Sequence, residues 1–233
     1  MTNQNLAALE PSQIAQYVQH TKIASDTTYD EIIAHAEEAA KHSFNAAMVP
    51  ATWVAEVAKV LSGTGVKVAS ALDFPTVGVT SSAGKAAEAE SLARLGVDEI
   101  DMGVQIGWLK SGRFDDFRKD IEGVVNASGR PVKVMLELPL LTLEERETAV
   151  ELAMDAGASF LKNASSGAIE TANPESVRFL VERAREGVQV KASGSIKTFE
   201  QAKSLLEAGA VLLGTSAGIE LLGGSNDESV SSY

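Results

Sequence analysis

Residues 142–162 read TLEERETAVELAMDAGASFLK, and this stretch holds one complete helix-and-strand unit. Thr142 and Glu145 have the spacing of a capping box, which satisfies backbone N–H groups at a helix start. The apolar positions of residues 142–156 follow helical spacing. Gly157 then favours the left-handed conformation that ends a helix. The apolar run Ser159–Lys162 therefore predicts a buried strand that ends on a lysine.

The same unit recurs along the chain. Gly96 and Gly209 each follow a predicted helix and precede a predicted strand, as Gly157 does. Each interval between these glycines has room for two βα units of about 25–30 residues. Apolar, β-rich runs predict strands at Tyr17–Ile23, Asn45–Val49, Val66–Leu72, Val97–Met102, Val132–Leu136, Ser159–Lys162, Val188–Ala192 and Ala210–Gly214. The chain therefore alternates strand and helix from end to end.

Strands that read as apolar runs indicate a parallel sheet covered by helices. Eight such units within 233 residues fit one α/β barrel of the (β/α)₈ kind. A doubly wound open sheet is the alternative, but it usually has fewer strands and no eightfold count. We predict a single (β/α)₈ TIM barrel over residues 1–222. Residues 223–233 are polar, Ser-rich and acidic, and we expect them to form a flexible tail.

Composition limits the class of protein and its partners. Hydrophobic residues make up 45% of the chain and there is no cysteine, so a large core is expected and thiol chemistry is excluded. The net charge of -12 disfavours nucleic acids and anionic membranes as partners. The first twelve residues lack the basic and apolar regions of a signal peptide, and no apolar run is long enough to span a bilayer. We therefore expect a cytoplasmic protein.

Three charged residues stand at predicted strand ends, where active sites of such barrels lie. They are Asp101, Lys162 and Lys191. A salt-bridged surface lysine is the alternative for either lysine alone, but two on adjacent strands favour a reactive pair. Burial and a nearby cation disfavour the ammonium form, and a neutral lysine forms an imine with a carbonyl. Lys191 would supply the cation and Asp101 would move protons.

Small polar residues follow two neighbouring strands. Ser193-Gly194-Ser195 comes after the seventh predicted strand, and Gly214-Thr215-Ser216-Ala217-Gly218 after the eighth. The loops in these two places commonly hold a phosphate in this architecture. Their backbone N–H groups can approach an anion closely, and Lys197 adds a positive charge. Ordinary turns, which also prefer Gly and Ser, are the alternative.

The three histidines do not form a cluster with metal-ligand spacing. His35 and His42 lie on a predicted helix that faces outward, so we expect surface or packing roles. His20 ends the first predicted strand and is a candidate for lining the mouth of the barrel. We expect no metal and no other cofactor.

Six segments, in order, resemble the deoxyribose-phosphate aldolases, and the similarity runs along nearly the whole chain. They are Val97–Met102, Gly107–Gly112, Pro131–Glu137, Phe160–Lys162, Val190–Thr198 and Leu213–Gly218. The resemblance implies a (β/α)₈ fold and a lyase activity without metal. The implied reaction is the reversible cleavage of 2-deoxyribose 5-phosphate to glyceraldehyde 3-phosphate and acetaldehyde.

The resemblance also implies residue roles. Lys162 would form the Schiff base, Lys191 would perturb it and join a proton relay with Asp101, and Tyr233 of the tail would assist proton transfer. The implied partners are small aldehydes and sugar phosphates, and a homodimer is implied. Candidates for substrate and phosphate binding are Thr21, Asn163, Ser165, Gly194, Ser195, Lys197, Gly214, Thr215 and Ser216.

Several positions depart from the family pattern. Gln19 stands where the family has aspartate, Met48 where it has cysteine, and Pro50 where it has asparagine. Residues 163–166 replace Thr-Ser-Thr-Gly. Ser195 replaces a glycine and would be strained if its φ is positive. These departures leave the imine chemistry in place and put the substrate preference and the phosphate affinity in question. They are consistent with a divergent branch or with an engineered aldolase.

Two other functions stay open at this point. One is a related Schiff-base aldolase that acts on a different or unphosphorylated aldehyde. The other is a barrel that binds a phosphate ligand without catalysis. Binding alone needs no combination of two lysines and an aspartate, so Asp101, Lys162 and Lys191 favour an enzyme.

Overall fold

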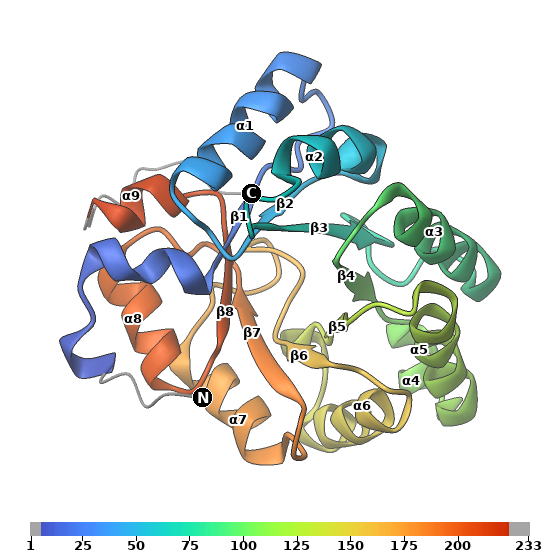
Figure 1. Ribbon diagram of the computed structural model, residues 1–233. Coiled ribbons are helices and arrows are strands. Elements are labelled where there is room, and N and C mark those ends of the chain that lie inside the picture. Colours follow the sequence, from blue (N-terminus) through green and yellow to red (C-terminus); the bar gives the residue numbers. More distant parts are fainter. Residues whose placement is uncertain (1–5, 224–233) are drawn as a thin grey trace.

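A computed structural model describes residues 6–223. Eight parallel strands close into one barrel, in which each strand pairs with the next along the chain and the last pairs with the first (Figure 1). The predicted (β/α)₈ fold is confirmed. The strands are β1 Val18–Thr21, β2 Ala46–Met48, β3 Lys67–Leu72, β4 Glu99–Gly103, β5 Val132–Met135, β6 Phe160–Lys162, β7 Gln189–Ser193 and β8 Leu212–Thr215.

Helices surround the barrel on the outside (Figure 1). Between residues 6 and 223, no helix is both long and apolar enough to cross a membrane. The α-helices are α1 Tyr29–Lys41, α2 Val54–Leu61, α3 Ser82–Leu95, α4 Ile106–Lys110, α5 Phe114–Ser128, α6 Leu143–Asp155, α7 Pro174–Arg183, α8 Phe199–Glu207 and α9 Gly218–Leu222. The 3₁₀ turns are η1 Leu6–Ala8, η2 Pro11–Tyr17, η3 Ala51–Trp53 and η4 Leu138–Leu140.

The unit at residues 142–162 folds as its sequence predicts. The backbone N–H of Glu145 donates to Thr142 Oγ1 at 3.3 Å, and the N–H of Thr142 donates to Glu145 Oε2 at 2.8 Å. Both capping-box bonds are therefore present at the start of α6. Gly157 has a φ of +91°, so the chain turns in the left-handed region before it enters β6.

Alternate residues of each strand face opposite sides of the barrel wall. In β4, Ile100 and Met102 belong to the large apolar core between strands and helices. Glu99 and Asp101 face the lumen, where they contact side chains from other strands. On the β2 and β3 side of the lumen, Ala46, Met48 and Ala69 form a small separate apolar cluster. The lumen therefore combines charged side chains with an apolar patch.

The structure corrects the predicted strand ends. Asp101 and Lys191 do not end their strands, because β4 continues to Gly103 and β7 to Ser193. The extra residues pair with neighbouring strands: Gly103 lies opposite Met135, and Ser193 lies opposite β8. Asp101 and Lys191 therefore lie inside the lumen, below its mouth.

A buried lysine ties the loop after β3 to the barrel. Lys85 of α3 is fully buried, and its Nζ donates to Asp120 of α5 and to the carbonyl of Gly103, each at 2.8 Å. Asp73, just after β3, lies 3.2 Å from the same amine and accepts from backbone N–H groups of residues 78–80. This network holds the rim of the barrel mouth at β3 and β4.

Replacing this lysine should destabilise the fold. Lys85→Met leaves two buried carboxylates without their cation, so the free energy of unfolding should fall by about 3–5 kcal/mol. Lys110→Met is the matched control, because Lys110 pairs with Glu145 at the surface, where an ion pair contributes about 0–1 kcal/mol. Urea unfolding followed by circular dichroism measures both. Equal stability of the two variants would contradict the assigned role of Lys85.

Candidate active site

Asp101 lies at the centre of a buried charge cluster. Its Oδ2 accepts from Lys162 Nζ at 2.8 Å and from Lys191 Nζ at 2.7 Å. Lys133 Nζ lies 3.3 Å from the other carboxylate oxygen. These residues come from β4, β5, β6 and β7, and the register pairs Asp101 with Lys133 and Lys162 with Lys191. The three predicted catalytic residues within the described chain are therefore in direct contact.

A second layer of polar groups lies behind Asp101. Glu99 Oε2 is 2.7 Å from Lys133 Nζ and accepts from Gln19 Nε2 at 2.8 Å. The Oε1 of Gln19 accepts from Lys191 Nζ at 2.6 Å. Lys67 of β3 also forms an ion pair with Glu99, and β3 flanks β4 on the side opposite to β5, which carries Lys133. The sequence analysis did not identify this layer. The signal that could have revealed it is a pair of polar residues two positions apart in an otherwise apolar strand, such as Glu99 and Asp101 in β4.

Burial and charge set the protonation states in the cluster. Burial alone would raise the pKa of Asp101, but Lys162, Lys191 and Lys133 outweigh it and hold that pKa well below its usual range. Burial also opposes ionisation of Glu99, yet Lys133 and Lys67 lower its pKa to about 2. Burial, aided by the two nearby lysines, lowers the pKa of Lys191 to about 7. Both carboxylates are therefore ionised at neutral pH, and Lys191 titrates close to it.

This geometry suits an amine nucleophile with proton transfer. A lysine that loses its proton in such a cluster can attack a carbonyl carbon. Lys162 ends β6 and is 4% exposed, whereas Lys191 lies in mid-strand, is 1% exposed and is also held by Gln19. Asp101 accepts from both amines on one oxygen, so a proton can pass between them through it.

The residue after Lys162 clamps β6 to β7. Asn163 is fully buried; its Oδ1 accepts from the N–H of Ser193 at 2.9 Å and its Nδ2 donates to the Ser193 carbonyl at 3.0 Å. The same Nδ2 donates to Glu170 at 2.7 Å. The side chain predicted to bind substrate is thus held by protein groups, and it fixes the end of the Lys162 strand.

Ser165, also predicted to bind substrate, contacts Glu137. Its backbone N–H donates to Glu137 Oε1 at 2.8 Å. Glu137 is buried directly after β5 with a φ of +51°, and burial is the main cause of its raised pKa. This contact joins the loop after β5 to the loop after β6, on the side of the mouth next to Lys162.

Two predicted phosphate-binding glycines allow close packing. Gly194 has a φ of +121°, and a Cβ there would overlap the carbonyl oxygen of Glu170. A Cβ on Gly214 would lie 3.1 Å from Lys191 Cε, in addition to overlapping Ser193 Oγ. Glycine at these positions lets the loop after β6 approach β7 and makes room in the lumen for Lys191.

A cavity of about 410 Å³ lies beside the loop after β7. The hydroxyl of Thr215 donates to the carbonyl of Ile196 at 2.6 Å, which ties the β8 end to this loop, and Ser216 follows. Of the predicted phosphate-binding residues, Ser195 and Lys197 line this cavity. Its lining residues are Thr171, Ser195, Lys197, Thr198 and Gln201.

The backbone φ of Ser195 is positive, which is the case in which the sequence analysis expects strain. Its φ is +48°, which costs an L-residue about 1–2 kcal/mol. Ser195→Gly should therefore raise the free energy of unfolding by about 0.5–1 kcal/mol. The control is Ser62→Gly, where φ is -56° and the same change should lower stability by about 0.5–1 kcal/mol. Thermal unfolding of both variants checks this; a loss of stability in Ser195→Gly would refute the strain.

His20, a candidate for lining the mouth, does not line it. Gln19 faces the lumen, so the alternation of β1 turns His20 outward toward α1. Its ring stacks on His35 at 4.3 Å and on Phe44 at 4.8 Å, and its Nε2 lies 2.8 Å from Glu38 Oε2. Burial lowers the pKa of His20 to about 4 and that of His35 to about 3. Both rings are neutral packing groups at neutral pH.

The same contacts form a possible metal-ligand set that the sequence spacing did not reveal. Ligand atoms of His20, His35 and Glu38 lie within 4.8 Å of one another, because a strand and a helix bring them together. Each histidine Nε2 is hydrogen-bonded, one to Glu38 and the other to the His20 carbonyl. These nitrogens are therefore engaged with protein groups in the structure.

Thr21 and Tyr233 complete the set of predicted site residues. Thr21 lies on the lumen side of β1, where its hydroxyl donates to the carbonyl of Gln19 at 2.9 Å. Tyr233 belongs to residues 224–233, which lie outside the described part of the chain.

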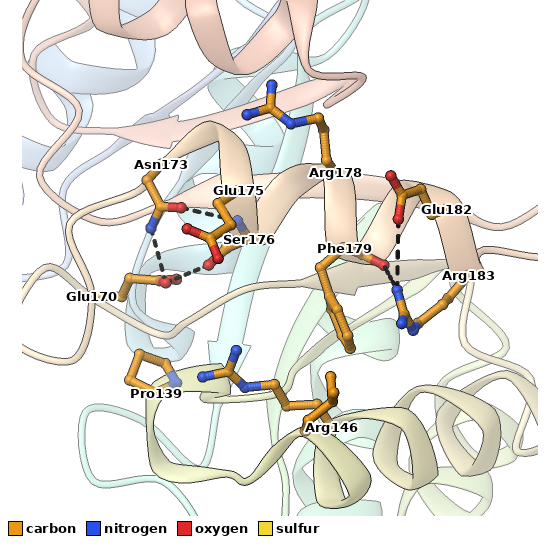
Figure 2. Close-up of a pocket in the computed structure, with 11 residues that line it drawn as sticks. Pro139, Arg146, Glu170, Asn173, Glu175, Ser176, Arg178, Phe179, Glu182 and Arg183 are labelled. Atoms are coloured by element: carbon orange, nitrogen blue, oxygen red, sulfur yellow. Dashed lines mark hydrogen bonds and ion pairs between the residues drawn. The ribbon is translucent and has the colours of Figure 1, made fainter.

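A larger cleft, of about 610 Å³, lies outside the barrel between α6 and α7. Figure 2 shows Glu170, Asn173 and Ser176 pointing toward one another at the start of α7. Arg183 pairs with Glu147 at 2.8 Å, also at the edge of this cleft. The polar side chains of this cleft are paired with one another, so we place the candidate site in the lumen and not here. Glu170 is connected to the end of β6 by its hydrogen bond with Asn163.

Comparisons with known proteins point to one family. No protein-family model matches the chain. A deoxyribose-phosphate aldolase of Staphylococcus carnosus is 39% identical over 216 residues, covering 92% of this chain and 98% of that protein. One of Streptococcus mutans is 38% identical over 218 residues, covering 93% and 99%. The tetrameric deoxyribose phosphate aldolase of Aeropyrum pernix is a structural neighbour with a TM-score of 0.84 and 26% identity, covering 94% and 93%.

Proposed function

Because the chain belongs to the deoxyribose-phosphate aldolase family and is an aldolase, we propose its specific reaction and mechanism. It cleaves 2-deoxy-D-ribose 5-phosphate reversibly into D-glyceraldehyde 3-phosphate and acetaldehyde, through an imine on Lys162. The observation that carries this proposal is the sharing of one Asp101 oxygen by Lys162 and Lys191.

The proposed steps use only these side chains and water. Neutral Lys162 attacks the C1 carbonyl, and loss of water gives a protonated imine. The C2–C3 bond then breaks, its electron pair moves into the imine to form an enamine, and the C3 hydroxyl loses its proton. Asp101 and Lys191 accept and return protons. Protonation of C2 and hydrolysis release acetaldehyde and restore the amine.

The position of each lysine supports this division of roles. Lys191 lies in mid-strand, where Gln19 and Asp101 both hold its amine. Its positive charge disfavours the ammonium form of Lys162, which ends its strand and is the more exposed of the two, at 4% against 1%. Lys162 is therefore assigned as the nucleophile and Lys191 as the electrostatic partner.

The substrate phosphate is assigned to the loops after β7 and β8. Ser195 and Lys197 line the adjacent cavity and offer a hydroxyl and an ammonium group. The remaining assigned positions are Gly194, Gly214, Thr215 and Ser216. Thr21, Asn163 and Ser165 are assigned to shaping the mouth, and Tyr233 to assisting proton transfer.

Borohydride trapping tests the imine. Acetaldehyde and borohydride should leave an ethyl group on Lys162, located by peptide mass spectrometry. Lys162→Met should abolish that adduct and lower turnover at least about 10³-fold, because no other group replaces the covalent step. Lys110→Met, at the surface, is the control and should trap normally. A folded wild-type protein that carries no adduct on Lys162 would refute the mechanism.

The phosphate assignment predicts a substrate preference. The kcat/KM for deoxyribose 5-phosphate should exceed that for deoxyribose by about 10²-fold or more, since charge-assisted hydrogen bonds contribute about 1.5–3 kcal/mol each. Lys197→Met should reduce this ratio. Equal rates with intact trapping would instead support an aldolase for unphosphorylated aldehydes. Phosphate binding without trapping would support a non-catalytic barrel.

A further inference from the structure

Strand β6 is short, and a side chain continues its pairing with β7. The backbone ladder between the two strands ends where Lys162 lies opposite Lys191. One residue further on, the Asn163 amide accepts from the Ser193 N–H at 2.9 Å and donates to the Ser193 carbonyl at 3.0 Å. Backbone groups of a neighbouring strand would otherwise supply these two bonds. Asn163 therefore extends the sheet directly after Lys162.

Glu170 selects the orientation of this amide. An asparagine Nδ2 carries two N–H donors. One donates to the Ser193 carbonyl, and Nδ2 also donates to Glu170 Oε2 at 2.7 Å. A flipped amide would direct its oxygen at the Glu170 carboxylate and its donors at the Ser193 N–H. Because both contacts would then be repulsive, the carboxylate holds the fully buried Asn163 in the orientation that pairs with Ser193.

Glu170 is itself held in place from two directions. Its Oε1 accepts from Asn173 Nδ2 at 3.0 Å and from the hydroxyl of Ser176, and Figure 2 shows these three side chains pointing toward one another. Its backbone carbonyl lies against Gly194, where a Cβ would overlap it. One chain of hydrogen bonds therefore runs from the start of α7, through Glu170 and Asn163, to the end of β6.

We propose that Glu170 is a positioning residue: through the Asn163 amide it fixes the end of β6, and with it the backbone that carries Lys162. Its effect on catalysis rests on the proposed imine at Lys162. That reaction needs the amine to be held within bonding reach of the substrate carbonyl, and a small misplacement lowers the rate strongly. Loosening the strand end therefore slows the reaction although every reacting group is still present.

The test is Glu170→Gln, which keeps the size of the side chain and replaces one acceptor oxygen by an NH2 group. Whichever way the new amide turns, its NH2 meets a donor, either Nδ2 of Asn163 or Nδ2 of Asn173. The kcat for cleavage of deoxyribose 5-phosphate should fall about 10-fold or more, as expected for a lost hydrogen bond to a charged group, with KM near the wild-type value. Glu175→Gln is the matched control. It makes the same change on an exposed side chain that lines the same cleft, and it should leave both constants unchanged.

Adding Asn173→Asp should rescue Glu170→Gln. The carboxylate introduced at position 173 accepts from the NH2 introduced at position 170, so the amide oxygen at 170 can accept from Asn163. The other oxygen at 173 still accepts from the Ser176 N–H at the start of α7, and the Ser176 hydroxyl can accept instead of donate. The exchange gives up the 3.3 Å contact with the Thr171 carbonyl. The kcat of the double variant should therefore return close to the wild-type value.

Amide hydrogen exchange reports on the strand end without catalysis. The Ser193 N–H donates to Asn163, so it should exchange about 10-fold faster or more in Glu170→Gln and slow again in the double variant. The N–H of Val211, which donates to the Val190 carbonyl at 2.9 Å, is the control and should exchange as in the wild type. NMR follows both amides.

The outcomes separate the explanations. A lower kcat in Glu170→Gln that the double variant restores supports the positioning role. An unchanged kcat, a loss without rescue, or a rise in KM alone overturns it, and the last would assign Glu170 to substrate binding. If Glu170→Gln does not fold, the double variant decides: a kcat near that of the wild type supports the role, and one reduced as far as predicted for Glu170→Gln overturns it. If Ser193 exchange shifts and is rescued but wild type forms no adduct on Lys162, Glu170 holds the strand end as inferred and the proposed function fails.

Discussion

One carboxylate oxygen, Oδ2 of Asp101, accepts from two lysines, and the chemistry proposed for this barrel depends on that contact. Two ammonium groups beside one buried carboxylate repel each other, and a third lysine, Lys133, increases the positive charge. In the proposed mechanism these lysines lower one another's affinity for protons, which gives the neutral amine that imine formation needs. The proposed chemistry therefore depends on a group of buried lysines that the fold must hold together.

The barrel supports it through strand register and through ties at the rim. Parallel pairing sets Asp101 beside Lys133 and Lys162 beside Lys191, so the lumen side chains meet without any loop. Asn163 then clamps the end of β6 to β7, which fixes the backbone next to Lys162. Lys85 does the same for the rim at β3 and β4. The apolar core outside the strands provides the burial that shifts the protonation states inside.

Sequence periodicity was sufficient for the architecture, and it pointed to three charged residues that the structure brings into contact. The eight strands, the capping box of Thr142 and the candidates Asp101, Lys162 and Lys191 follow from patterns that are local in the chain. Gln19 was noted as a departure from the family pattern, but its contact with Glu99 was missed because the two residues lie far apart in the chain, and only the closed barrel brings them together. The sequence left the direction of His20 open because a shift of one residue along a strand reverses the side chain's direction. The substrate phosphate stays a proposal, since turns rich in Gly and Ser also serve packing, as Gly194 and Gly214 do.

The most direct measurement counts protons on the lysines themselves. Nitrogen-15 labelling of lysine Nζ, with signals assigned by Lys133→Met, Lys162→Met and Lys191→Met, reports the protonation of each amine by NMR. The account requires one amine of the buried cluster to be neutral at about pH 8, well below the ordinary lysine pKa of about 10.4. If all three buried lysines stay ammonium up to about pH 10, the cluster is a structural ion-pair network and the account is wrong.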